Sequence, residues 1–226
     1  MNDSIIRDRR LTAADIAALS ADGAAHHLVE CDLEEAALVD CNLSGWTFER
    51  VSVQHADFRG AKLERTTWRS CRGGFANFTG CDLTEASVMS SDFNNAVFRG
   101  ARIGSARFMS CKLTGADLSE TKAMDVRFEE TLLINAKLPS YSFQKMTLNR
   151  IDFSHADLRK CDFRATTFEG CSLREANMAG ARFAGADLRG ADLGGLRLVD
   201  AALFRGATIS REQAGQLLGE LGLNVR

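Results

Sequence analysis

The chain has little of several things that would point to a specialised class of protein. Its 226 residues include 1 proline and 1 tyrosine, and 19 glycines are an ordinary number, so collagen-like and proline-rich disordered chains are excluded. No apolar run approaches the roughly 18 residues of a membrane span. The opening run, MNDSIIRDRR, lacks the apolar core of a signal peptide. We therefore expect a folded, cytoplasmic protein with no membrane partner.

An excess of charge of one sign is also missing. Lys and Arg number 28 and Asp and Glu 30, for a formal net charge of -2. This balance does not predict direct binding to nucleic acid. The 7 cysteines are an odd number and form no CxxC motif, which favours free thiols over disulfides or a zinc site.

A repeat of five residues organises most of the chain. In blocks of five the sequence runs HHLVE, CDLEE, AALVD, CNLSG, and the third residue of each block is large and apolar. These centres continue from Leu28 to Leu203 without an insertion, and 34 of the 36 are Leu, Phe, Ile, Val, Met or Trp. The residue two before each centre is mostly Ala, Cys, Thr or Ser, and the other positions are mostly polar, charged or Gly.

A period of five fits neither a helical turn of about 3.6 residues nor the alternation of a continuous strand. It fits a chain in which a centre and the residue two before it point the same way, and which then turns a corner. Four such sides close a square coil, and the 36 blocks give nine coils. We therefore predict an all-β fold, a quadrilateral β-helix of about nine coils.

Blocks such as ADFRG, CDLTE, ADLSE and ADLRG resemble the pentapeptide-repeat family, and the resemblance covers residues 26 to 205. It implies that the β-helix is right-handed.

Both ends depart from the repeat. In LTAADIAALSADG, Thr12 is a candidate N-cap with Asp15 three residues on, which predicts a short helix over the first coil. At the other end the frame slips by one residue, and SREQAGQLLGELG places Ser210 and Gln213 in the positions of a capping box. We predict three parts: a helical cap over 1–25, the β-helix over 26–208, and a helix with a strand-like tail over 209–226.

The residues that most often carry chemistry have structural explanations here. All 7 cysteines occupy the small inward position two before a centre, where they pack as small apolar residues. His55 and His155 occupy the last, outward position of their blocks and lie too far apart along the β-helix to share a metal. His26 takes an inward position, where a cap could supply its hydrogen-bond partner. No Ser/His/Asp or Cys/His set can be assembled. We expect no enzymatic activity, no cofactor and no metal.

Charge is distributed unevenly over the four sides. Within residues 28 to 203, the side with centres from Leu33 to Leu193 carries seven acids and three bases. The opposite side, with centres from Leu43 to Leu203, carries five acids and seven bases. The acids of the first side, called here the acidic face, are a candidate partner-binding surface. They are Asp32, Glu34, Glu35, Asp92, Asp152, Glu175 and Asp192.

Two centres are small, Gly73 and Ala123. Phe75, two residues after Gly73, either folds back into the vacant inward position or lies exposed. If they are exposed, Phe75, Met89, Met109 and Met124 would suit a partner surface.

The run SREQAGQLLGELGLNV resembles the C-terminus of the quinolone-resistance Qnr group and its relatives MfpA and AlbG. In that group a helix with paired leucines and a following apolar strand form a two-fold dimer. Its members bind type II topoisomerases, chiefly DNA gyrase, by resembling a DNA duplex in width and charge. The resemblance implies a homodimer that binds DNA gyrase or topoisomerase IV and does not itself bind nucleic acid. The residues that match the dimer interface are Ala214, Leu217, Leu218, Leu221, Leu223 and Val225.

Two functions therefore stay open. One is a non-enzymatic dimer that binds a type II topoisomerase by DNA mimicry and modulates it or protects it from quinolone-type inhibitors. The other is a structural or scaffolding β-helix that binds another protein. The second is favoured by the near-neutral charge and by the unbroken frame, which lacks the loops of the Gram-negative Qnr proteins.

Overall fold

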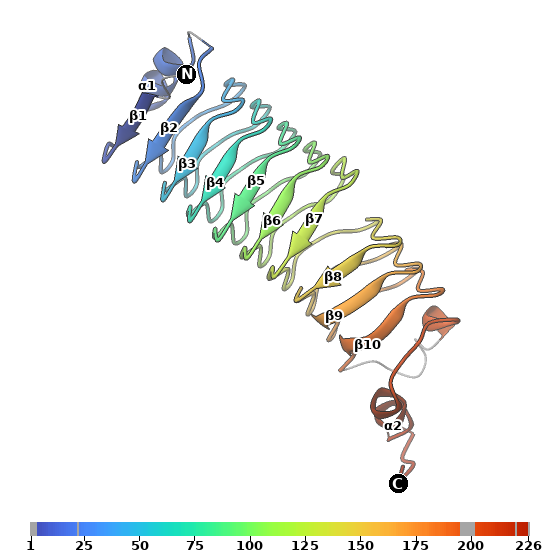
Figure 1. Ribbon diagram of the computed structural model, residues 1–226. Helices are drawn as coiled ribbons and strands as arrows, with labels where there is room; N and C mark the ends of the chain where they lie inside the picture. Colours follow the sequence, from blue (N-terminus) through green and yellow to red (C-terminus); the bar gives the residue numbers. More distant parts are fainter. Residues whose placement is uncertain (1–3, 22, 195–201, 220, 226) are drawn as a thin grey trace. The chain divides into compact units, whose positions relative to one another are not determined.

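A computed structural model describes residues 4–21, 23–194, 202–219 and 221–225 (Figure 1). The chain divides into two compact units, Met1–Leu132 and Leu133–Arg226. The first unit contains β1 (Ser4–Arg7), α1 (Ala13–Ser20), β2 (His26–Val29), β3 (Thr47–Glu49), β4 (Thr67–Arg69), β5 (Ser87–Met89), β6 (Arg107–Met109) and β7 (Arg127–Glu129). The second contains β8 (Thr147–Asn149), β9 (Thr167–Ser172), β10 (Asp187–Asp192) and α2 (Arg211–Gly219).

Within each unit, backbone hydrogen bonds join adjacent coils. In the first unit β2 to β7 pair in parallel at a step of twenty residues, as Phe48 pairs with Trp68. Isolated bridges repeat this step on the other sides, as between Asp32 and Ser52. In the second unit Thr147 of β8 pairs with Thr167 of β9 in the same way. The predicted right-handed quadrilateral β-helix of about nine coils is confirmed.

The centres form the core as the period predicts. Because successive coils lie at the strand spacing, aromatic centres stack ring on ring. Phe58, Phe78 and Phe98 lie with ring centroids 4.9 Å apart in the first unit. In the second unit the rings of Phe143 and Phe163 lie 5.2 Å apart. In the described coils, the side chains that point inward therefore pack against one another in stacks.

From Glu30 to Gly185, the corner that redirects the chain lies at the last residue of each block. There φ is positive whether the residue is Gly, as at Gly60 (φ 67), or a bulky residue such as His55 (φ 57) or Phe75 (φ 60). A non-glycine residue in this conformation costs roughly 1–2 kcal/mol. The hydrogen bond from its N–H to the next coil offsets this cost, as from His55 to the Gly74 carbonyl at 3.0 Å.

The two small centres are accommodated differently. A Cβ at Gly73 would lie 2.2 Å from a ring carbon of Phe93, so the ring of the next coil occupies the vacant position. Phe75 does not fold back: it is 58% exposed and stacks on His55 with ring centroids 5.2 Å apart. Ala123 is half-buried, and Met124 beside it is 79% exposed. Of the two alternatives for Phe75, exposure is therefore the one observed.

The inward cysteines are free thiols, as predicted. Six are buried and Cys41 is half-buried. Burial raises the pKa of Cys71 and of Cys111 to about 11. Their S–H groups point to backbone carbonyls of the preceding coil, as from Cys71 to Phe48 at 3.3 Å. These cysteines therefore pack as small, weakly polar residues.

The N-terminal end is closed by a strand and a helix. The predicted N-cap Thr12 is present and forms a capping box: Asp15 N–H donates to the Thr12 hydroxyl, and Thr12 N–H donates to the Asp15 carboxylate. Ile16 of α1 is fully buried. The His26 ring nitrogen lies 2.8 Å from the Leu19 carbonyl, so the helix satisfies the inward histidine. Strand β1, which pairs in parallel with β2, was not expected from the sequence.

Candidate functional site

The acidic face is built by residues on either side of buried centres. Because Leu33, Phe93, Phe153 and Leu193 point inward, their neighbours in sequence point outward. Asp32, Asp92 and Asp152 are half-buried. The exposed members are Glu34, Glu35, Glu175 and Asp192. The structure thus leaves all seven predicted acids open to solvent at least in part.

Each aspartate of the acidic face also supports its own turn. The carboxylate accepts the N–H two residues on: Glu34 to Asp32 at 2.9 Å, and Ser154 to Asp152 at 2.9 Å. Asp192 does the same for the Gly194 N–H at 2.8 Å. These are Asx turns, in which the side chain substitutes for a backbone acceptor. One oxygen is therefore structural, and the negative charge stays at the surface.

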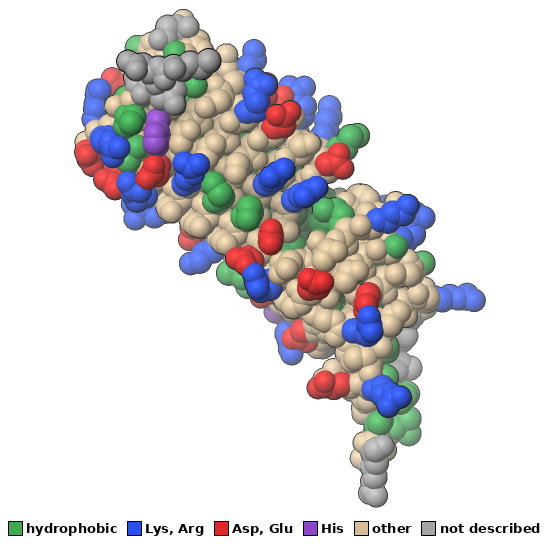
Figure 2. Space-filling view, in the orientation of Figure 1, with side chains coloured by type: hydrophobic (Ala, Val, Ile, Leu, Met, Phe, Trp, Pro, Cys, Tyr) green, Lys and Arg blue, Asp and Glu red, His purple; other side chains and the backbone are tan. Residues whose placement is uncertain are grey.

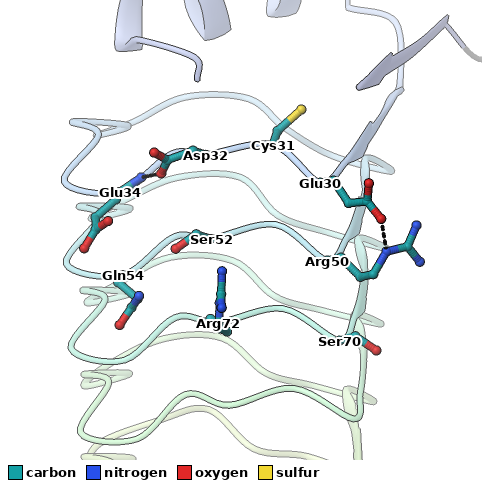
Figure 3. A pocket seen from close by; sticks show the side chains of 9 residues that line it. All are labelled: Glu30, Cys31, Asp32, Glu34, Arg50, Ser52, Gln54, Ser70 and Arg72. Carbon is teal, nitrogen blue, oxygen red and sulfur yellow. Dashed lines mark hydrogen bonds and ion pairs between the residues drawn. The ribbon is translucent and has the colours of Figure 1, made fainter. Parts of the chain in front are cut away.

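In the first unit the acids are grouped at one end. Asp32 and Glu34 line a shallow polar hollow with Ser52, Gln54 and Arg72 (Figure 3). The other side chains around the hollow are Glu30, Cys31, Arg50 and Ser70.

Bases accompany the acids of this hollow. Arg50 donates to Glu30 at 2.6 Å and lowers the pKa of that carboxyl through the hydrogen bond. Further along, Asp92 lies in register between Arg72 and Lys112. The acidic face of this unit is thus a cluster followed by alternating charges, which the count of residues alone did not show.

In the second unit one column carries two of the three acids of the acidic face. Asp152 and Asp192 are each in register with Ser172, so no base separates them in the column. Arg174 reaches Asp192 at 3.3 Å, where both side chains are about half exposed, so the pair is weak. Asp152, Glu175 and Asp192 therefore form the part of the acidic face with the least neutralisation.

Several arginines outside the acidic face are paired with aspartates of the same block. In ADFRG, Arg59 binds Asp57 at 2.7 Å, and in ADLRK, Arg159 binds Asp157 at 2.7 Å. The guanidinium hydrogen bond lowers the pKa of both carboxyls. On the side opposite the acidic face, Arg102 binds Asp82 of the adjacent coil at 2.8 Å. The Asp-x-Arg pattern is the sequence signal for the pairs within a block.

The C-terminal helix is anchored by a buried amide. Ser210 N–H donates to Gln213 Oε1 at 2.7 Å, and Gln213 N–H donates to the Ser210 hydroxyl at 3.1 Å, so the predicted capping box forms. The Gln213 amide also donates to the carbonyls of Leu188 and Ala191, each at 2.7 Å. The frame slip is visible as well, because Thr208 is in register with Asp187 at a step of 21 residues. Gln213 therefore fixes α2 to the edge of β10.

The apolar residues of α2 and its tail lie at the surface. Leu218 is 40% exposed, and Leu221, Leu223 and Val225 are each more than half exposed. Ala214 and Leu217 are half-buried. Four of the six predicted interface residues thus form an exposed apolar surface, and Ala214 and Leu217 are partly covered by their own chain.

The tail is not the strand that alternation suggested. Gly222 has φ 76; its N–H donates to Gly219, and the N–H of Leu223 donates to Leu218. This is a Schellman ending, which reverses the chain after a helix. The reversal brings Val225 against Gly215 of α2. The expected strand at Leu223 and Val225 is therefore wrong for this chain.

Within the described residues, no group of three or more His, Cys, Asp and Glu side chains is arranged to hold a metal ion. His55 and His155 are exposed, as expected. No helix among those residues is long and apolar enough to cross a membrane.

The square, parallel β-solenoid with a five-residue block defines the class of protein. The chain belongs to the pentapeptide-repeat family: the family model, described as pentapeptide repeats, matches eight copies within residues 27–65, 76–115, 142–174, 156–195 and 168–203.

Solved structures of QnrB1, a plasmid-mediated fluoroquinolone resistance protein, share this fold. A trypsin-treated variant is 23% identical with a TM-score of 0.72, covering 90% of this chain and 100% of QnrB1. Full-length QnrB1 is 22% identical with a TM-score of 0.71, covering 88% and 100%. No curated protein matches the sequence.

Proposed function

We propose that this chain is a non-enzymatic dimer that binds a type II topoisomerase, DNA gyrase or topoisomerase IV, in the cytoplasm. Its acidic face takes the place of DNA on the enzyme, and it thereby modulates the enzyme or protects it from quinolone-type inhibitors. The observation that carries the proposal is the fold shared with a fluoroquinolone resistance protein along that protein's whole length.

The exposed apolar surface of α2 supports a dimer. A helix of 9 residues is too short to be stable alone, so its apolar residues need to pack against other parts of the protein. Gln213 fixes one side to β10, while Leu218 and Leu221 remain open to solvent. A second copy that meets the first through the same residues around a two-fold axis would cover them.

The acids of the second unit are the best candidates for imitating phosphates. Asp192 directly follows Ala191, whose carbonyl binds Gln213 of α2. A two-fold axis at α2 would therefore place Asp152, Glu175 and Asp192 of the two chains on either side of the dimer interface. Their spacing is sparser than the one charge per about 1.7 Å of duplex DNA, so the contact would involve few charges.

The Asx turns decide which substitution tests this face. Asparagine keeps the acceptor for the N–H two residues on and removes the charge, so Asp152→Asn with Asp192→Asn should change stability by only about 0.5 kcal/mol. The matched control is Asp82→Asn with Asp157→Asn, which removes two charges from the same block position on other sides.

The assay is DNA supercoiling by gyrase with added protein, with and without a fluoroquinolone. The parent should change supercoiling or the response to the drug, the acidic-face variant should need about tenfold more protein for the same effect, and the control should match the parent. Equal potency of all three proteins would reject the acidic face as the contact.

The scaffold function is the second candidate, and the Asp–Arg pairs favour it. They neutralise charge on the side that carries Arg59 and Arg159, and they weaken the electrostatic field there. A parent protein without effect on supercoiling by gyrase or topoisomerase IV would favour this function.

A further inference from the structure

One side of the first unit carries arginines that no carboxylate neutralises. This side is the ladder of β3 to β7, and its outward residues flank the buried centres Phe48 to Phe128. Arg69, Arg107 and Arg127 are exposed here, and no ion pair to any of them occurs among the described residues. The Asp-x-Arg arginines such as Arg59 are paired by contrast.

Two of these arginines stand directly beside each other. Arg107 of β6 and Arg127 of β7 are register partners on adjacent parallel strands. Their Cα atoms are therefore separated by about the strand spacing of 4.8 Å, and like charges in this position destabilise a sheet. The equivalent position on β5 is Ser87, which shows that the fold does not require arginine there.

A pair of methionines lies next to the arginine pair. Met89 and Met109 are register partners, and Arg69 is the register partner of Met89. Met109 is 40% exposed. Figure 2 shows hydrophobic side chains between basic ones over the middle of this ladder. We call Arg69, Met89, Arg107, Met109 and Arg127 the arginine–methionine strip.

The acids near the strip do not neutralise it. Glu49, the register partner of Arg69, binds Arg50 and His27. Glu130 accepts a hydrogen bond from Ser110 at 2.8 Å. Glu129 is the register partner of Met109 and makes no ion pair with the strip among the described residues. The strip thus keeps its positive charge in the folded chain.

We propose that the arginine–methionine strip is a docking surface for an acidic helical segment of a partner protein, separate from the acidic face. Carboxylates three or four residues apart on a helix are about 4.5–6 Å apart along its axis, which matches the separation of Arg107 and Arg127. An apolar residue on the same helix face would pack on Met89 and Met109, because methionine side chains adapt to varied partners.

A nucleic acid fits the strip less well than an acidic protein. Three arginines neutralise few phosphates, and the chain as a whole has a net charge of -2. The methionine pair, of which Met89 is half-buried and Met109 exposed, offers nothing to a phosphate backbone but suits an apolar side chain. Relief of the repulsion between Arg107 and Arg127 by two carboxylates supplies the specificity.

The probe is a fluorescein-labelled peptide of about 15 residues, long enough to form a helix, with glutamates at a spacing of four and leucines on the same face. Companion probes replace the glutamates by glutamine or the leucines by serine, and a DNA duplex tests the phosphate alternative. Fluorescence anisotropy with the full chain gives the affinity of each.

The variant is Arg107→Ser with Arg127→Ser, which copies Ser87 of the same column. The matched control is Lys62→Ser with Lys122→Ser, which removes two exposed bases from the neighbouring side of the same unit, the side opposite the acidic face. The variant should bind the acidic peptide at least about tenfold more weakly than the parent, and the control should not. Its thermal midpoint should equal or exceed that of the parent, since a repulsive pair has been removed.

A second variant, Met89→Ser with Met109→Ser, should weaken the leucine peptide but not the serine peptide. The proposal is wrong if the parent binds no peptide, if the lysine control loses as much affinity as the arginine variant, or if the duplex binds more tightly than the acidic peptide. None of these measurements involves a topoisomerase, so they stand or fall independently of the proposed function.

Discussion

The two ends of the chain use a short helix for opposite purposes. At the N-terminal end, α1 buries Ile16, and its Leu19 carbonyl lies within hydrogen-bond distance of the His26 ring. Strand β1 adds a further strand to the ladder. At the C-terminal end, α2 is fixed by the polar contacts of Gln213 while Leu218 and Leu221 stay exposed. One helix therefore closes a core, and the other is anchored in a position that leaves Leu218 and Leu221 exposed.

The strongest test of this contrast is the oligomeric state. Leu218→Asp with Leu221→Asp places two charges on the exposed surface of α2 and should abolish the dimer, because buried unpaired charges would be costly. Sedimentation should show a monomer with an unchanged β-type circular dichroism spectrum. Leu217 is left intact because it is half-buried within the chain. The control, Ile5→Asp with Val39→Asp, changes two equally exposed apolar residues of the first unit and should remain a dimer. A dimer in both variants would place the interface elsewhere.

Replacing one apolar side chain of each helix by alanine should have a large effect on stability in α1 and a small one in α2. Ile16→Ala removes a fully buried side chain and should cost about 2–5 kcal/mol of unfolding free energy. Leu218→Ala removes an exposed one and should cost less than about 0.5 kcal/mol when chains are dilute enough to be monomers. Urea unfolding followed by circular dichroism measures both. Similar costs would mean that α2 is packed on its own chain as tightly as α1.

The anchor of α2 can be tested by changing one atom group. Gln213→Glu keeps the acceptor for Ser210 N–H but removes the donors to Leu188 and Ala191. A carboxylate against two carbonyl oxygens should cost about 1–3 kcal/mol near neutral pH.

The effect of Gln213→Glu should depend on pH with a defined sign. The folded state favours the protonated acid, so the pKa of this glutamate should be raised on folding. The variant should therefore regain stability as pH falls towards about 4, relative to the parent. Gln216→Glu on the exposed side of α2 should show no such recovery. A loss without pH dependence would indicate that the carboxylate has moved into solvent.

Much of the fold could be predicted because one rule applies to every block. Centres such as Phe58 and Phe78 must point inward together, and the period fixes which residues do so. The corner conformation was less accessible, since Glu35, His55 and Phe75 adopt the same positive φ as Gly60. The hydrogen-bond ladder between coils enforces the positive φ, and the residue type at the corner does not predict it.

The surface was less predictable than the core because its charges interact across coils. Counting acids marked the acidic face but could not show that Arg72 and Lys112 flank Asp92. The Schellman ending had a signal in Gly222, one residue beyond the helical pattern, that outweighs the alternation of Leu223 and Val225. The contacts of Gln213 depend on carbonyls more than twenty residues away and left no local pattern.

The smallest expected effect compares the two capping boxes. Thr12→Ala and Ser210→Ala each remove a hydroxyl that accepts an N–H of the first helical turn, and each should cost about 0.5–2 kcal/mol. The Thr12 hydrogen bonds lower the pKa of Asp15, so this contribution is present above the ordinary pKa of an aspartate and is lost as pH falls below it. Thr12→Ala should therefore reduce the pH dependence of unfolding in the acid range and leave the dimer intact. Ser210→Ala should instead weaken the dimer in sedimentation, because a frayed α2 presents Leu218 poorly. If both variants weaken the dimer alike, the two helices are not used for different purposes, and the contrast between the ends is wrong.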